Sequence, residues 1–205
     1  TAPDPAMLAQ LAQALDGSLR PAFVVGAGVD RDGAVDAVVA LAERHQAAVY
    51  TAPMSARCGF PEQHPLFAGF LAAMRERIVE ALAGHDLVVV LGAPAFSYHV
   101  EGQGPHMPPG ADLWQIVDDP QMAAWTPAGT GIVSSVHLAV AALLAAPAPA
   151  AARKAPEPRR PAPRAEPSLP MSVAYALQAL DAARGPEDVV VEEAPGSRGV
   201  MQACL

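Results

Sequence analysis

The chain is poor in aromatic side chains and in positive charge, and both shortages narrow the class of protein. Aromatic residues make up 5% of the 205 positions while apolar residues make up 52%, so we expect a core built mostly of Ala, Val and Leu. The formal net charge is -8, which leaves no basic face for nucleic-acid phosphates. The basic cluster between Arg153 and Arg164 lies in a proline-rich stretch, and we interpret it as a solvated linker.

Cysteines, long apolar runs and common catalytic motifs are scarce as well. Cys58 and Cys204 lie far apart and match neither a disulfide framework nor a Cys/His metal spacing. No apolar run reaches the roughly 18 residues of a membrane span, and no signal peptide is visible. GxSxG, Walker and HExxH motifs are missing, which argues against a self-contained enzyme of a common kind. We therefore expect a cytoplasmic protein with neither nucleic-acid nor membrane partners and, since the sequence starts without Met, one cut from a longer chain.

Between residues 1 and 146, short apolar runs alternate with helical patterns. Strands are predicted at AFVVGAGV, AAVYTAP, DLVVVLG, ADLWQIVDD and GTGIVSS, and the main helices over 5–15, 32–45, 71–83 and 136–146. Continuous apolar strands that alternate with helices are typical of parallel pairing with helices on both faces. The pattern predicts a doubly wound, Rossmann-like α/β domain with a mostly parallel sheet of about five or six strands.

The rest of the chain changes character twice. Residues 147–170 are rich in Pro and Ala without apolar periodicity, which predicts a semi-extended linker. Residues 171–205 contain one helical pattern and one apolar run, DVVVEE, which predicts one helix and one strand. These elements are too few for a core of their own, so we interpret them as the start of a second, truncated α/β domain.

Gly26 and Gly28 follow the first predicted strand, and two interpretations are open. The pattern lacks the third glycine of a dinucleotide fingerprint, because position 31 is Arg. The acidic residue expected after the next strand is also missing. A tight strand-to-helix turn that needs glycine is favoured, with contact to FAD or another nucleotide as the alternative.

Several other polar residues are predicted to be structural. The loop RCGFPEQHP contains Cys58 and His64, but its spacing fits no standard metal-ligand set, so we expect an ordered loop with Phe60 and Pro61 packed inward and predict no metal site on this chain. His45 and His85 follow helical patterns, where the helix dipole favours a charged imidazole.

His99 is the best candidate for chemistry. It lies in GAPAFSYHVEGQG, directly after the most apolar predicted strand. Ligands of open α/β sheets bind at the carboxyl ends of the strands, and histidine exchanges protons near neutral pH. A loop histidine held only by backbone contacts is the alternative.

Four stretches together resemble a known family: PAFVVGAGVD, LAERHQAAVYTAPMSARCGFPEQHPLFAGF, GHDLVVVLGAPAFSYHVEGQG and VDDPQMAAW. They are similar to the central domain of thiamine diphosphate-dependent 2-oxo acid decarboxylases, over about residues 5–146 and more weakly over 171–205. The RCGFPEQHPLFAG and GAPAFSYH stretches resemble the benzoylformate decarboxylase branch in particular.

The resemblance implies a division of labour. The family has pyrimidine-binding, central and diphosphate-binding domains, works as dimers or tetramers, and binds thiamine diphosphate and Mg²⁺ between subunits. Its activating glutamate and its GDG motif are not found here, so the chain is expected to be an inactive part of a decarboxylase that acts on benzoylformate or a similar aromatic 2-oxo acid. His99 matches the family's proton-transfer histidine, Phe96 and Tyr98 would pack to aim its loop, and no cofactor-binding residue is assigned. A non-catalytic nucleotide-binding or assembly domain is the second hypothesis.

Overall fold

The computed structural model describes residues 1–149, 153–193 and 195–204. They belong to two compact units, Thr1–Pro158 and Arg159–Leu205, each considered by itself below. Residues 150–152 of the predicted linker lie outside the described residues. Within the described ranges, every helix is too short or too polar to span a membrane.

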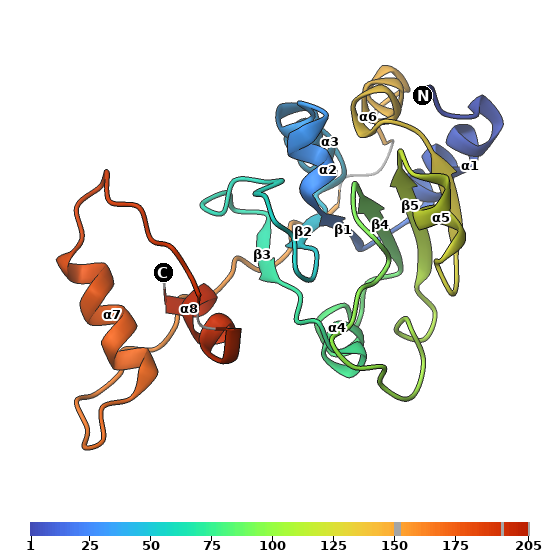
Figure 1. The fold of residues 1–205 in the computed structure, drawn as a ribbon. Helices are drawn as coiled ribbons and strands as arrows, with labels where there is room; N and C mark the ends of the chain where they lie inside the picture. Colours follow the sequence, from blue (N-terminus) through green and yellow to red (C-terminus); the bar gives the residue numbers. More distant parts are fainter. Residues whose placement is uncertain (150–152, 194, 205) are drawn as a thin grey trace. The chain divides into compact units, whose positions relative to one another are not determined.

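The first unit is built on a six-stranded sheet in which every neighbouring pair is parallel (Figure 1). The order across the sheet is β3-β2-β1-β4-β5-β6, so the chain reverses its direction of travel between β1 and β4. This confirms the predicted doubly wound α/β class. The strands are β1 (Pro21–Val25), β2 (Ala48–Thr51), β3 (Phe67–Phe70), β4 (Leu87–Leu91), β5 (Asp112–Val117) and β6 (Thr130–Val133).

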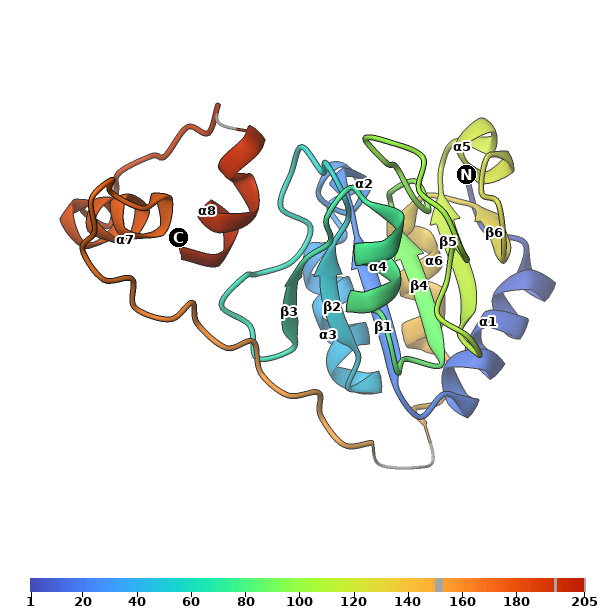
Figure 2. The same cartoon turned by 90° about the horizontal axis from the view of Figure 1, so that it is seen from below.

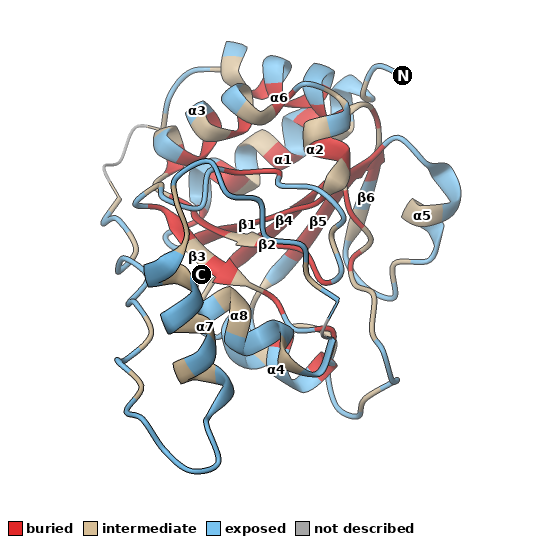
Figure 3. Ribbon diagram, turned by 60° about the vertical axis from the view of Figure 1, so that its left-hand side comes forward, coloured by how far each residue is buried: buried red, intermediate tan, exposed pale blue. Residues whose placement is uncertain are grey.

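Three helices cover one face of this sheet: α1 (Pro5–Gly17), α3 (Val35–His45) and α6 (Val136–Ala145). Their apolar residues, among them Leu11, Leu41 and Val140, form the larger core cluster with alternate residues of the strands. Asp4 caps α1 by accepting hydrogen bonds from the N–H groups of Ala6 and Met7. Figure 3 shows the buried strands against these helices.

The opposite face is covered differently, by α4 (Arg75–Ala81) and by the loop 92–111 that joins β4 to β5 (Figure 2). Ile78 and Leu82 pack here against Val88 and Val90 of β4. The crossover from β4 to β5 contains no helix, so the loop itself has to cover apolar surface. The second core cluster therefore depends on how this loop is held.

The strand β3 and the starts of two helices differ from the prediction. β3 is an edge strand in a segment where no strand was predicted, and α4 begins at Arg75 rather than near residue 71. The helix predicted to begin at residue 32 begins at Val35, because Gly33 adopts a φ of 63° that no helix continues. A separate short helix, α2 (Ala27–Arg31), precedes it, and another short helix, α5 (Pro120–Ala124), follows β5.

The second unit is helical, with α7 (Val173–Ala183), a 3₁₀ turn η1 (Pro195–Ser197) and α8 (Arg198–Cys204). The strand predicted at DVVVEE is wrong: residues 188–193 are described and carry no strand. Val189 and Val191 in this run are 87% and 86% exposed. A strand needs a neighbour to satisfy its backbone groups, and these residues pair with none among the described part of the chain.

Arg153 fastens the end of the first unit to α1. Its guanidinium donates hydrogen bonds to the carbonyls of Asp16 and Ser18 at 3.0 and 2.7 Å, where α1 leaves carbonyls without helical partners. It also lies 3.2 Å from Nδ1 of His45, so that nitrogen accepts and the imidazole is neutral. Burial, reinforced by Arg153 and Arg44, lowers the pKa of His45 to about 4 although Asp16 opposes the shift. The expectation of a charged histidine at this helix end is therefore wrong.

The His45 environment predicts acid sensitivity. Between pH 6.5 and about 4 the unfolded chain binds a proton on His45 that the folded chain does not. The free energy of unfolding therefore falls as the pH drops, by about 2 kcal/mol from His45 alone between pH 6.5 and 5. Urea denaturation of wild type and His45→Gln at both pH values measures this difference. An equal loss in both proteins would contradict it.

Candidate functional site at the carboxyl edge of the sheet

The turn after β1 is packed tightly against the start of the loop after β4. The N–H groups of Gly26 and Gly28 donate to the carbonyls of Leu91 and Gly92, both at 2.9 Å. A Cβ on Gly26 would lie 2.4 Å from Cβ of Ala93, and a Cβ on Gly28 would lie 2.7 Å from Cα of Gly92. Both glycines are therefore required by close backbone packing, and their N–H groups are already used. This favours the tight-turn interpretation over contact with FAD or another nucleotide.

A buried glutamine on the neighbouring strand β5 also holds the start of this loop. Gln115 on β5 is fully buried, and its Nε2 donates to the carbonyl of Ala93 at 2.8 Å. Its Oε1 accepts from the hydroxyl of Thr126 at 2.5 Å. A buried amide costs stability unless it is paired, and here both of its ends are paired. The first residues of the loop 92–111 are thus fixed from β1 and from β5.

Beyond Ala93, apolar side chains hold the loop to the second face. Phe96, Tyr98 and Met107 are partly buried and pack against the core cluster that includes Ile78 and Val90. The prediction that Phe96 and Tyr98 pack is confirmed. The hydroxyl of Tyr98 also lies 3.2 Å from Nδ1 of His106, so His106 has a partner that the sequence did not indicate. Burial and the charge of Arg75 lower the pKa of His106.

His99 is exposed while its backbone is anchored. Its N–H donates to the carbonyl of Ala73 at 3.0 Å, between the carboxyl end of β3 and the start of α4. Its imidazole has no hydrogen bond or ion pair to any described residue. The structure thus has a solvent-facing imidazole, on a supported backbone, in a loop that follows the carboxyl end of β4. Such a group is able to donate or accept a proton.

The loop 52–66 gives the other sequence candidates structural roles. The thiol of Cys58 lies 3.7 Å from Oε1 of Glu62, and burial together with that carboxylate raises its pKa, so it stays protonated. Nδ1 of His64 accepts from the N–H of Leu66 at 3.2 Å, and its Nε2 lies 3.2 Å from Oε1 of Glu43. Neither side chain is arranged for catalysis.

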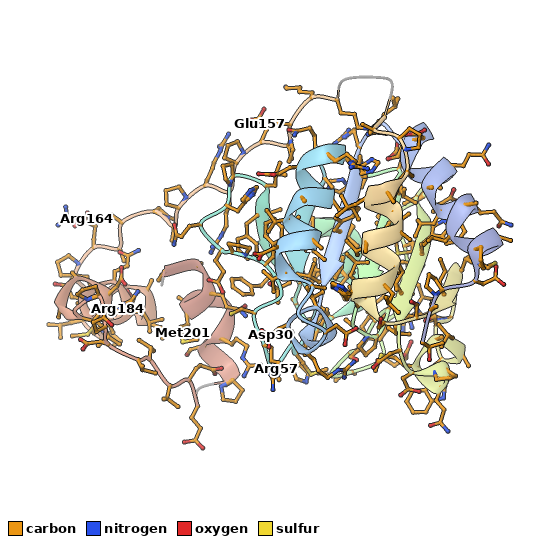
Figure 4. All side chains as sticks on the ribbon, turned by 90° about the horizontal axis from the view of Figure 1, so that it is seen from above. Asp30, Arg57, Glu157, Arg164, Arg184 and Met201 are labelled. Atoms are coloured by element: carbon orange, nitrogen blue, oxygen red, sulfur yellow. The ribbon has the colours of Figure 1, made fainter. Side chains whose placement is uncertain are left out.

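The same loop is fastened to the first turn after β1. Arg57 and Asp30, which follow the carboxyl ends of β2 and β1, form an ion pair at 2.7 Å (Figure 4). Both side chains are well exposed, so the pair orients the loop more than it stabilises the fold. Phe60 is buried as predicted, whereas Pro61 is exposed.

His85 also differs from the sequence interpretation. Its Nδ1 lies 2.9 Å from the carbonyl of Arg20, and its Nε2 lies 3.4 Å from the hydroxyl of Tyr50. Burial lowers its pKa, and the hydrogen bond to Arg20 only partly opposes this. His85 is structural as predicted, but its imidazole is held neutral rather than charged.

The described residues do not fit the diphosphate end of a thiamine diphosphate cofactor. Such a site needs oxygen ligands for Mg²⁺ and unused backbone N–H groups for the phosphates. Among residues 1–149, 153–193 and 195–204, no group of three or more His, Cys, Asp or Glu side chains could hold a metal ion. The glycine turn after β1 has its N–H groups occupied. We therefore assign no cofactor-binding residue to this chain.

Arg75 is the site residue that the sequence did not indicate. It stands in RERIVEA, which reads as a charged surface helix, yet its side chain is only 8% exposed. Its guanidinium contacts the loop that carries His99. That burial depends on a contact between segments distant in sequence, so no local pattern signals it.

Known proteins match this chain in both sequence and structure. A benzoylformate decarboxylase of Pseudomonas aeruginosa is 39% identical over 193 residues, which cover 93% of this chain and 36% of the relative. The crystal structure of benzoylformate decarboxylase from Polynucleobacter necessarius matches all of this chain at a TM-score of 0.92 and 32% identity, over 39% of that chain. A thiamine diphosphate-dependent 4-hydroxybenzoylformate decarboxylase of Rhodococcus jostii RHA1 matches 99% of this chain at a TM-score of 0.85 and 29% identity, again over 39% of its own.

The chain thus spans between 36% and 39% of the length of these relatives. Residues 8–143, which include the whole sheet and the loop with His99, match the model of the thiamine pyrophosphate enzyme central domain. From this match and the agreement of the fold, we conclude that the chain belongs to the thiamine pyrophosphate enzyme family, with residues 8–143 as the central domain.

Proposed function

We propose that this chain is the central domain of a thiamine diphosphate- and Mg²⁺-dependent carboxy-lyase that converts benzoylformate, or a similar aromatic 2-oxo acid, into an aldehyde and CO₂. In this proposal the complete enzyme is a homo-oligomer in which other domains bind the cofactor. The observation that carries the proposal is the exposed imidazole of His99 beyond the carboxyl end of β4, which has no partner among the described residues. The names of the relatives support the substrate class.

The chemistry of 2-oxo acid decarboxylation explains why the central domain would contribute a single reactive side chain. Loss of CO₂ from a 2-oxo acid requires an electron sink, which no protein side chain offers and which the thiazolium of thiamine diphosphate supplies when bound. What the protein must add is a proton at the right place and limited access of water. An imidazole is suited to proton transfer near neutral pH, and the hydrogen bond from the His99 N–H to the carbonyl of Ala73 anchors the backbone that carries it.

The proposal predicts that the 205-residue chain alone is inactive. The purified chain, mixed with thiamine diphosphate and Mg²⁺, is expected to release no benzaldehyde from benzoylformate above the background rate. Calorimetric titration is expected to detect no micromolar binding of thiamine diphosphate, because the described residues offer no diphosphate site. Measurable turnover by the isolated chain would contradict the assignment of the cofactor site to other domains.

Calorimetric titration with nucleotides also tests the competing hypothesis, that the chain is a non-catalytic nucleotide-binding domain. A nucleotide-binding domain would bind FAD, NAD or ADP with micromolar affinity. We expect no such binding, because Leu91 and Gly92 already accept the N–H groups of Gly26 and Gly28. Binding of one of these nucleotides would favour a non-catalytic role for the glycine turn.

A further inference from the structure

We propose that Arg75 is a positioning residue for His99: its buried guanidinium holds the segment 98–104 against the first turn of α4. This inference rests on the proposed function of His99, but its physical content concerns contacts within this chain. Three contacts join the guanidinium to that segment. It donates to the carbonyl of Gly104 at 3.1 Å, forms an ion pair with Glu101, and stacks over the ring of Tyr98 with 5.5 Å between Cζ and the ring centroid.

These contacts lie on both sides of His99 in the sequence. Tyr98 immediately precedes it, and Glu101 and Gly104 follow it. Arg75 contacts the ring of Tyr98 and the carboxylate of Glu101. Because these two residues flank His99, the contacts restrict the movement of its backbone. The hydrogen bond from the His99 N–H to the carbonyl of Ala73 fixes the remaining point.

The neighbour of Arg75 adds a second attachment on the same turn of α4. The carboxylate of Glu76 accepts from the N–H of Gln103 at 2.9 Å, and that hydrogen bond lowers the pKa of Glu76. A Cβ on Gly102 would lie 2.6 Å from Oε1 of Glu76, so the loop backbone lies directly against the carboxylate. Residues 73–76 therefore form a short platform for residues 98–104.

The energetics distinguish positioning from simple stabilisation. Arg75 is only 7% exposed, while the side chain of its partner Glu101 is 70% exposed. The Nε of Arg75 is buried and has no hydrogen-bond partner in the part of the chain that the structure describes. A buried charge with an unpaired donor is costly, and an apolar residue of similar size often serves stability as well or better. An arginine gives instead a planar group with several donors in fixed directions, which is suited to fixing the geometry of a loop.

Hydrogen–deuterium exchange in the complete enzyme tests the inference without relying on activity. In Arg75→Met we expect the amides of 98–104 to exchange about tenfold faster or more, because the loop opens more often. The matched control is Arg77→Met on the same helix, where Arg77 pairs with Glu80 and its side chain is 64% exposed. Unchanged exchange in Arg75→Met relative to this control would overturn the proposal. Should Arg75→Met fail to fold, Glu101→Gln removes the ion pair by changing its exposed partner. The exchange rates of the amides of 98–104 are then compared with the same control.

Turnover provides the second readout. A positioning role predicts that Arg75→Met lowers kcat about tenfold with KM changed by less than about twofold, since the substrate still binds. On a His99→Ala background the same substitution is expected to cause no further loss, because the two residues act as a unit. An equal loss on both backgrounds would overturn the proposal.

The two hypotheses fail separately. If His99→Ala leaves turnover unchanged, the proposed function of His99 fails. The exchange rates of 98–104 then decide alone whether Arg75 holds this loop.

Discussion

Replacing His99 by Ala in the complete enzyme is expected to lower the turnover of benzoylformate by roughly 10²-fold or more, the range usual for a residue that transfers protons. The imidazole is exposed, has no partner among the described residues, and follows the carboxyl end of β4. Its removal should leave the fold intact, because its anchoring contact is made by the backbone N–H. Steady-state kinetics with saturating thiamine diphosphate and Mg²⁺ measure the effect.

His137→Ala is the matched control for this substitution. His137 is also exposed, but it lies on α6, on the face opposite the loop 92–111. Its removal is expected to leave turnover within about twofold of the wild type, as for a surface substitution away from the site. A rate for His99→Ala as high as that of the control would make His99 an ordinary loop residue.

Gly26→Ala is expected to destabilise the first unit by about 3 kcal/mol, the upper range for overpacking a close contact. The added methyl would lie 2.4 Å from Cβ of Ala93 and 2.8 Å from the carbonyl oxygen of Gly92, so backbone would have to move. For a unit of this size the loss corresponds to a melting temperature lower by roughly 6–12 °C. Thermal denaturation of the 205-residue chain, followed by circular dichroism, measures it.

Gly17→Ala is the control with the opposite sign. Gly17 ends α1, and a Cβ there would meet nothing within 4 Å. Alanine in a helix is favoured over glycine, so stability is expected to stay unchanged or rise by about 0.5–1 kcal/mol. Equal melting temperatures for Gly26→Ala and Gly17→Ala would show that the turn after β1 is not tightly packed, and would reopen the nucleotide interpretation.

The sequence was informative where one local pattern determines the structure. The strands β1 and β4 are buried at every residue, and their continuous apolar runs predicted parallel strands with both faces covered. Capping chemistry likewise accounts for the start of α1, because Asp4 is favoured at the N-cap and Pro5 at the first helical position. The position of His99 after β4 followed from the same reading, because the loop begins where the apolar run ends.

Features that depend on distant partners were missed. β3 reads as FAGF inside a stretch rich in Gly and Pro, and it is a strand because β2 offers an edge to pair with. The apolar run near Val189 resembles a strand more clearly, yet it has no neighbouring strand among the described residues and carries no regular secondary structure. The burial of Arg75 likewise depends on a distant segment: the loop 98–104 follows β4 in the sequence, whereas α4 precedes it.

At His45, burial and neighbouring charges outweigh the helix dipole, which on its own would favour a charged imidazole at a helix end. A helix dipole favours a charged imidazole by about 0.3–1 kcal/mol at exposed positions. His45 is 5% exposed and faces Arg153 and Arg44, and its pKa is lowered to about 4. That shift corresponds to about 3 kcal/mol in favour of the neutral form, so burial and the two arginines outweigh the dipole.

The central claim is that His99 serves a cofactor that other domains bind, and a crystal structure of the complete enzyme with thiamine diphosphate and an unreactive substrate analogue tests it most directly. We expect the imidazole of His99 to lie within hydrogen-bond reach of the bound analogue, roughly 3 Å away or joined to it by one water. An imidazole that faces bulk solvent away from the cofactor, with the analogue's proton-accepting atom contacted by another residue, would contradict it.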